Sequence, residues 1–349
     1  MEPKKYEYID SLRGIAILLV ILTHVRQYLR FFPEIVNQFT LDGHLGVQLF
    51  FIVSAFTLTM SYHSRINEQN KTRNFFIRRF FRIAPLFYLA IIFSCYNILS
   101  GNYDRSHELS VFEVLASFLF INGFFPEYIN SLVLGGWSIT VEFTFYFCMP
   151  FICSKVKNLN SSILFFILTL LFATSFNKVL TILMPNDTTG FLFYNIIYQL
   201  PVFALGILAY WMINDKNKKV KPIIVLLGAF TVFFYCYFTL PRHVIYSLFF
   251  VLLLLTLYLK PYKILSNKIL ANIGKVSFSM YITHFSFVYL IRELKLITVT
   301  DTLSASINLV VSYVFVFVCS FLISQLTYRF IEQPGQNLGR KLIKKLNQQ

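Results

Sequence analysis

The stretch that decides the fold class is Leu12–Leu29, LRGIAILLVILTHVRQYL. An apolar run of this length suits a helix that crosses the hydrocarbon core of a bilayer, which is about 30 Å thick. Basic residues precede the run, as in a secretory signal peptide, but it lacks a small-residue cleavage site and carries Arg13 and His24. We therefore interpret it as a retained transmembrane helix.

The composition of the whole chain agrees with a lipid environment. Of its 349 residues, 56% are hydrophobic and only 13% are charged, against roughly 25% charged residues in an ordinary soluble domain. Apolar runs of roughly 16 to 22 residues recur to the end of the sequence, which is too many for a single anchor. The sequence therefore predicts an all-α, polytopic helix bundle in a membrane.

Ten membrane spans give the topology that best fits the charges. The stretch 111–124 is apolar but short, so we interpret it as interfacial or re-entrant, with an eleventh span as the alternative. With ten spans and a cytoplasmic N-terminus, 23 lysines and arginines lie inside and seven outside, whereas an eleventh span would send the later lysine clusters outside. Both termini are thus expected in the cytoplasm. The expected spans are approximately 12–30, 45–62, 83–99, 138–153, 161–180, 193–213, 222–240, 243–259, 276–292 and 304–326.

One membrane domain is expected over residues 1–335, followed by a basic cytoplasmic tail over residues 336–349. No internal repeat or low-complexity tract is visible. The net charge of +15 does not indicate nucleic-acid binding, because no basic patch is interleaved with aromatic residues on a soluble face. The five cysteines mostly lie in apolar runs without the spacing of metal ligands, so we expect no metal and no redox chemistry.

Arg13 and His24 are ionisable residues within the first span. Such groups are costly in a bilayer and are functional candidates by default. They are eleven residues apart in the sequence, so at about 100° per residue they share one face of a helix, roughly 16 Å apart. This separation suits an extended cofactor such as coenzyme A, whose charged head would stay near Arg13 while its pantetheine arm reaches toward His24.

Histidine is the side chain best suited to proton transfer near neutral pH. His24 is therefore a candidate to deprotonate a hydroxyl group or to accept an acyl group itself. The alternative is that His24 hydrogen-bonds a neighbouring helix while Arg13 anchors the membrane interface.

A second group of polar residues opens the fourth expected span from the outside, in Gly136–Glu142, GWSITVE. Glu142 would lie about one turn into the membrane, at a depth comparable with that of His24, where a carboxylate could orient and stabilise the imidazole. The alternative is an interhelical ion pair, for example with an arginine. Trp137 and Ser138, at the outer start of the same span, are candidate substrate-binding residues.

Arg78, Arg79 and Arg82 lie at the cytoplasmic start of the third expected span. Guanidinium groups bind phosphates through two parallel hydrogen bonds, so this cluster is a candidate to bind coenzyme A. Setting the topology and binding anionic lipid are the alternatives. Further along, His284 lies near the middle of the ninth expected span and is a second candidate on the acceptor side, although a lone membrane histidine also bonds neighbours.

Taken in order, these segments resemble the acyltransferase-3 family of membrane acyltransferases over nearly the whole chain. Arg13, ten intervening residues and His24 resemble the family's opening motif, whose histidine is regarded as catalytic. Gln48 and Ala55 depart from the family pattern, in which an acidic residue and a glycine are usual. The other matching segments are Gly46–Phe56, Arg79 with Arg82, Trp137–Glu142, Tyr281–His284 and Tyr328–Pro334.

The resemblance implies an acyl-coenzyme A donor, usually acetyl-coenzyme A, and a cell-envelope or exported carbohydrate as the acceptor. We therefore expect a multi-pass O-acyltransferase of a bacterial-type cytoplasmic membrane. His24 and Glu142 would be catalytic, and Arg13 and the arginine cluster would bind the donor. A lipid-linked sugar flippase is the alternative, disfavoured by the absence of repeated halves, and a glycan polymerase is a third possibility.

Overall fold

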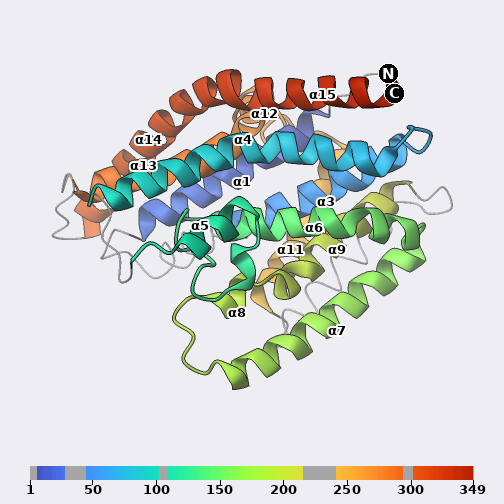
Figure 1. Cartoon of the computed structure of the whole chain (residues 1–349), viewed down its shortest axis with the longest axis horizontal. Coiled ribbons are helices and arrows are strands. Elements are labelled where there is room, and N and C mark those ends of the chain that lie inside the picture. Colours follow the sequence, from blue (N-terminus) through green and yellow to red (C-terminus); the bar gives the residue numbers. More distant parts are fainter. Residues whose placement is uncertain (1–5, 28–44, 102–107, 215–240, 294–301, 349) are drawn as a thin grey trace. The chain divides into compact units, whose positions relative to one another are not determined.

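The computed structural model describes residues 6–27, 45–101, 108–214, 241–293 and 302–348, and all regular elements in these ranges are helices (Figure 1). The predicted all-α class is therefore confirmed for this part of the chain. Two compact units are present. Unit 1 comprises Met1–Val53 and Lys219–Tyr328, and unit 2 comprises Ser54–Lys218 and Arg329–Gln349.

Unit 1 is built around α1 (Glu7–Arg26), which contacts α11, α12, α13 and α14. Leu12, Ile17 and Ile21 on α1 are fully buried. A helix that is apolar on all sides is expected at the centre of a bundle, and α1 has this pattern. The other helices are α11 (Arg242–Leu259), α12 (Lys268–Lys275), α13 (Ser277–Glu293), α14 (Thr302–Thr327) and the first part of α3 (Gly46–Ser64).

Glycines set the closest helix contacts in unit 1. A Cβ atom on Gly274 of α12 would lie 1.7 Å from the carbonyl oxygen of Asp10 on α1. A Cβ on Gly46 of α3 would lie 2.5 Å from the carbonyl oxygen of Ala16. These positions therefore need glycine for backbones to approach each other, the usual role of small residues between membrane helices.

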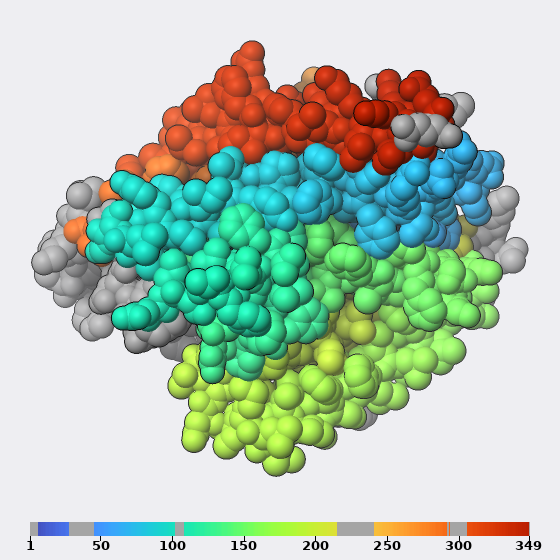
Figure 2. Space-filling view, in the orientation of Figure 1, coloured from blue at the N-terminus to red at the C-terminus, as the bar shows by residue number. Residues whose placement is uncertain are grey.

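Unit 2 contains the rest of α3 and the helices that carry the arginine cluster and Glu142. Figure 1 shows α15 running along α4, and in Figure 2 the red atoms of α15 lie against the blue-to-cyan atoms of α4. Gly335 and Gly339 of α15 make this approach possible, since a Cβ on either would lie within 3.0 Å of Pro85 or Phe81. The helices are α4 (Lys71–Leu99), α5 (Val111–Phe118), η2 (Asn122–Phe124), α6 (Gly136–Lys155), α7 (Leu159–Leu183), α8 (Phe191–Tyr194), α9 (Ile196–Asn214), η3 (Tyr328–Glu332) and α15 (Gln333–Gln348).

Six helical segments in the described ranges are long and apolar enough to cross a membrane. In Leu159–Leu183 and in the segment that begins at Ser306, only 17% of the most apolar 18-residue stretch is buried inside the protein. Their outward faces carry exposed leucine, isoleucine, valine and phenylalanine side chains, and contiguous apolar surface of this extent marks contact with lipid or another apolar partner. The six segments are Glu7–Arg26, Lys71–Leu99, Leu159–Leu183, Phe191–Asn214, Arg242–Leu259 and Ser306–Gln348.

Three further expected spans are present as helices outside this group of six. They are α3, α6 and α13, which contain more polar side chains or a shorter apolar segment. The expected span 222–240 lies outside the described residues. The stretch 111–124 forms the eight-residue helix α5 and the short helix η2, and a helix of eight residues is too short to cross a bilayer.

Candidate functional site

In unit 1, His24 lies beside His284. Helix α1 carries His24 in its last turn, α13 carries His284, and the centroids of the two imidazole rings are 5.2 Å apart. The ring of Phe285 packs against both, with centroids 4.4 Å from His24 and 4.1 Å from His284. Two histidines that are 260 positions apart in the sequence thus form one group.

The hydrogen bonding of His284 determines where its proton lies. The side chain is fully buried, and its Nδ1 lies 3.1 Å from the carbonyl oxygen of Met280. A carbonyl can only accept, so Nδ1 is the protonated nitrogen. Among the described residues, Nε2 has no hydrogen-bond partner. His284 is thus fully buried next to a half-buried His24, whose Nδ1 lies 3.4 Å from Gln27 Oε1.

Arg13 lies on the same uninterrupted helix as His24. Its Nη1 is 3.1 Å from Asp10 Oδ1, one turn earlier, and both side chains are largely buried. An acidic partner holds the guanidinium in place, but Arg has five donors and can contact a second anion. This pairing was not anticipated from the sequence, although the spacing of three residues is the usual one for an ion pair on a helix.

In unit 2, Glu142 on α6 accepts two hydrogen bonds from hydroxyl groups. Ser54 of α3 donates to Oε1, and Tyr146 donates to the same oxygen over 2.7 Å. The guanidinium of Arg79 lies over the ring of Tyr146, 5.9 Å from its centroid. The motif around Glu142 thus joins α3 to the arginine-bearing helix α4. The expected support of His24 by Glu142 involves residues of different units and stays a prediction.

The arginine cluster divides into two environments. Arg78 binds the carboxylate of Glu68 through two hydrogen bonds of 2.7 and 2.9 Å. Asn74 donates to the same carboxylate over 3.0 Å. Burial raises the pKa of Glu68, but the hydrogen bonds and charges of its neighbours outweigh this effect and lower the pKa overall. By contrast, Arg79 lies over the aromatic rings of Phe75 and Tyr146.

Trp137 and Ser138 are buried at the start of α6. The indole of Trp137 stacks on the ring of Tyr194, with centroids 4.5 Å apart and planes 26° apart. The hydroxyl of Ser138 donates to the carbonyl of Gly135 over 2.9 Å. Both side chains thus stabilise the loops around the N-terminal end of α6.

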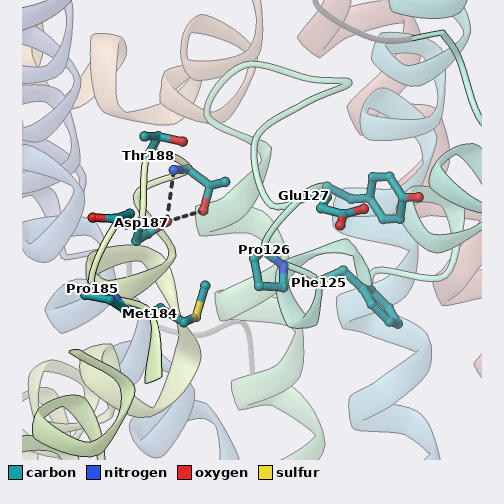
Figure 3. Close-up of a pocket in the computed structure, with 10 residues that line it drawn as sticks. Phe125, Pro126, Glu127, Met184, Pro185, Asp187 and Thr188 are labelled. Atoms are coloured by element: carbon teal, nitrogen blue, oxygen red, sulfur yellow. Dashed lines mark hydrogen bonds between the residues drawn. The ribbon is translucent and has the colours of Figure 1, made fainter. Parts of the chain in front are cut away.

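An open pocket of about 560 Å³ lies between two loops of unit 2 (Figure 3). One wall is the 125–128 loop, which contributes Pro126 and Glu127, and the other is the 184–189 loop, which contributes Met184 and Asp187. The volume falls within the range of small-molecule sites, roughly 300–1,000 Å³. The pocket leaves no signal in the sequence, because its walls come from segments joined only by tertiary contacts.

Some functional neighbours could have been found from the sequence and others could not. Tyr146 follows Glu142 by four residues, so a helix places them on one face. Ser54 and Glu68 gave no such local signal, because their partners come from other helices. In the described part of the chain, no cluster of three or more potential metal ligands is present.

The sequence is similar to known proteins along most of its length. The sequence profile of the acyltransferase-3 family, described as an acyltransferase domain, matches residues 6–329. A provisionally named O-acetyltransferase of Staphylococcus aureus (strain COL) is 25% identical over 97% of this chain and 59% of its own length. A provisionally named acetyltransferase of Acidianus two-tailed virus is 25% identical over 79% of this chain and 81% of its own.

The chain spans about three-fifths of the length of the staphylococcal relatives that it matches. No solved structure matches. The profile covers both units, including the segments that hold His24, Glu142 and His284. The chain therefore belongs to the acyltransferase-3 family of membrane acyltransferases.

Proposed function

We propose that this protein transfers an acetyl group from cytoplasmic acetyl-coenzyme A to a hydroxyl group of a cell-envelope or exported carbohydrate. It would do so as a ten-span protein of a bacterial-type cytoplasmic membrane, with both termini inside. The names of the relatives support O-acetyl transfer, and the distribution of basic residues supports the orientation.

The observation that carries the proposal is the pair of imidazoles formed by His24 and His284. A half-buried imidazole next to a second, fully buried imidazole is suited to accept a proton from a hydroxyl group. In this mechanism, His24 takes the proton of the acceptor hydroxyl while its oxygen attacks the thioester carbonyl. The carbon–sulfur bond then breaks, and the thiolate of coenzyme A takes up the proton. The same residues also suit a route in which His24 first receives the acetyl group.

Basic residues near one end of the spans would bind the donor. Arg13 lies before His24 on α1, and Arg78, Arg79 and Arg82 lie on α4. Guanidinium groups are suited to the diphosphate and 3′-phosphate of coenzyme A. Arg78 already binds Glu68 through two hydrogen bonds. In this proposal Arg78 also contributes to the phosphate site, and Glu68 holds its guanidinium in position.

Glu142 is assigned a supporting role. Its Oε1 is held by Ser54 and Tyr146, so the carboxylate has a fixed position rather than a mobile one. A fixed negative charge stabilises a positive imidazolium. On this proposal, replacement of Glu142 by glutamine keeps the size of the side chain but removes the charge that favours proton uptake by His24.

The test uses purified protein in a bilayer nanodisc, acetyl-coenzyme A labelled in the acetyl group and cell-envelope glycans. We expect the label to appear in alkali-labile esters on the glycan. If the folded protein binds no acetyl-coenzyme A and transfers no label, the proposal is wrong and the flippase alternative is favoured. The double variant Arg79→Ala/Arg82→Ala should raise the Kd for acetyl-coenzyme A, and Lys178→Ala is the control for loss of a basic residue elsewhere.

A further inference from the structure

We propose that the pocket between the 125–128 and 184–189 loops binds a saccharide segment of the acceptor. This inference rests on the proposed function and specifies where that acceptor is held.

The pocket combines apolar and polar groups as a saccharide site requires. Pro126, Met184 and Pro185 provide apolar surface, and Glu127, Asn186 and Thr188 provide polar side chains (Figure 3). A sugar ring has C–H faces and a rim of hydroxyl groups, so it matches both kinds of surface. Sites of this type have mostly apolar walls with a few polar groups that set orientation.

The polar groups at the rim have free hydrogen-bonding capacity. Among the described residues, none forms a hydrogen bond or ion pair with the side chains of Glu127, Asn186 or Thr188. Glu127 offers acceptors, Asn186 offers both donors and an acceptor, and Thr188 offers one of each. Hydroxyl groups of a sugar both donate and accept, so each of these side chains can engage one.

The 184–189 wall is held rigid by Asp187. Its carboxylate accepts hydrogen bonds from the backbone N–H of Thr189 at 2.9 Å, the hydroxyl of Thr189 at 2.6 Å and the N–H of Leu192 at 2.9 Å. Burial raises the pKa of Asp187, but these bonds outweigh it and lower the pKa overall. A preformed loop loses little conformational entropy when a ligand binds.

The 125–128 wall is held by an aromatic cluster and by Asn122. The rings of Phe125 and Tyr128 pack on Phe112, with centroid distances of 5.0 and 5.8 Å. The side-chain amide of Asn122 lies 3.4 Å from the carbonyl oxygen of Tyr128. Its oxygen accepts a hydrogen bond of 2.6 Å from Thr140 on α6.

Both walls are therefore fastened to the helix that carries Glu142. The first is tied by Asn122 to Thr140, and the second leads into Tyr194, which stacks on Trp137. Trp137 and Thr140 lie within the two turns that precede Glu142 on α6. A saccharide in this pocket would thus be placed by the same helix that carries the proposed catalytic carboxylate.

The experiment compares Glu127→Ala/Asn186→Ala with Glu108→Ala, which removes an exposed acidic side chain outside the pocket. The double variant should raise the KM for glycan roughly tenfold, equivalent to about 1.4 kcal/mol, with the KM for acetyl-coenzyme A unchanged. Glu108→Ala should change neither value. An unchanged KM for glycan in the folded double variant would overturn the proposal.

A binding assay without the donor separates this inference from the proposed function. The chain has two tryptophans, so Trp211→Phe leaves Trp137 as the only indole, stacked on Tyr194 behind one wall of the pocket. Oligosaccharides released from the same glycans should shift its fluorescence, and the double variant should lose this response. Binding without acetyl transfer would support the pocket and contradict the proposed function, whereas transfer with unchanged glycan binding in the double variant would contradict only the pocket.

Discussion

The hydroxyl of Tyr146 donates a hydrogen bond of 2.7 Å to Oε1 of Glu142, one helical turn earlier on α6. Ser54 donates to the same oxygen from α3. Two hydroxyl donors from two helices fix one oxygen of a half-buried carboxylate. The carboxylate of Glu142 is thus held in one position by groups from α3 and α6.

Removal of one of these donors should reduce catalysis without unfolding the protein. Tyr146→Phe keeps the ring but loses a hydrogen bond to a charged group, which is worth about 1.5–3 kcal/mol. We expect kcat for acetyl transfer to fall roughly tenfold or more, measured with labelled acetyl-coenzyme A. Tyr88→Phe on α4 is the matched control and should leave kcat unchanged. Equal activity of the two variants would show that Glu142 does not need this support.

His284→Phe tests the second imidazole. Phenylalanine can fill the fully buried site and removes Nε2, which has no hydrogen-bond partner in the described part of the chain, so the packing of α13 should be kept. We expect expression and thermal stability close to those of the wild type but a loss of acetyl transfer of roughly tenfold or more. Thr283→Val, which removes a neighbouring polar group on the same helix, should retain activity. If His284→Phe has the kcat of the wild type, His284 contributes to packing and not to catalysis.

Low pH should weaken the network of Glu68, Arg78 and Asn74. The folded-state pKa of Glu68 lies below the ordinary value of 4.5. The network therefore contributes its full stability above the unfolded pKa, and the contribution is lost as the pH falls through the lower folded-state value. Glu68→Gln should have a lower Tm than the wild type at pH 7. The difference in Tm between the two proteins should become smaller below pH 4.5. A difference in Tm that does not depend on pH would contradict the stabilising role of the Glu68 carboxylate.

Gly274→Ala should disrupt unit 1. The added Cβ would lie 1.7 Å from the carbonyl oxygen of Asp10, so α12 and α1 would have to separate. Overpacking of this kind costs roughly 1–3 kcal/mol or more. We expect a reduced Tm in detergent and less correctly folded protein on size-exclusion chromatography. Asn272→Ala alters an exposed position on the same helix and should be neutral. A stable Gly274→Ala protein would mean that this contact is looser than described.

The sequence was sufficient for the helical class and for residues whose signals are local. Arg13 and His24 lie on one helix as their spacing predicts, and six of the expected spans are present as long apolar helices. Helix α6 is not among these six, and it carries the polar residues Ser138, Thr140 and Glu142 in its first turns. Hydropathy alone therefore underestimates the number of expected spans, because helices that carry polar functional residues are less apolar.

Tertiary contacts account for what the sequence could not reveal. Nothing near His24 in the chain identifies His284 as its neighbour, because the contact depends on how α1 packs against α13. Similarly, Arg78 on α4 belonged to a basic cluster in the sequence, but it binds Glu68 in the turn between α3 and α4. The pocket between the 125–128 and 184–189 loops likewise requires the fold of unit 2.

The most direct measurement is acetyl transfer by His24→Ala beside the wild type, in nanodiscs, with labelled acetyl-coenzyme A and envelope glycans. Loss of a general base lowers the rate by roughly 10²–10⁴-fold. We predict a loss of this size, with normal membrane insertion and unchanged binding of acetyl-coenzyme A. Full transfer activity in His24→Ala would contradict the central claim that His24 performs the proton transfer or carries the acetyl group.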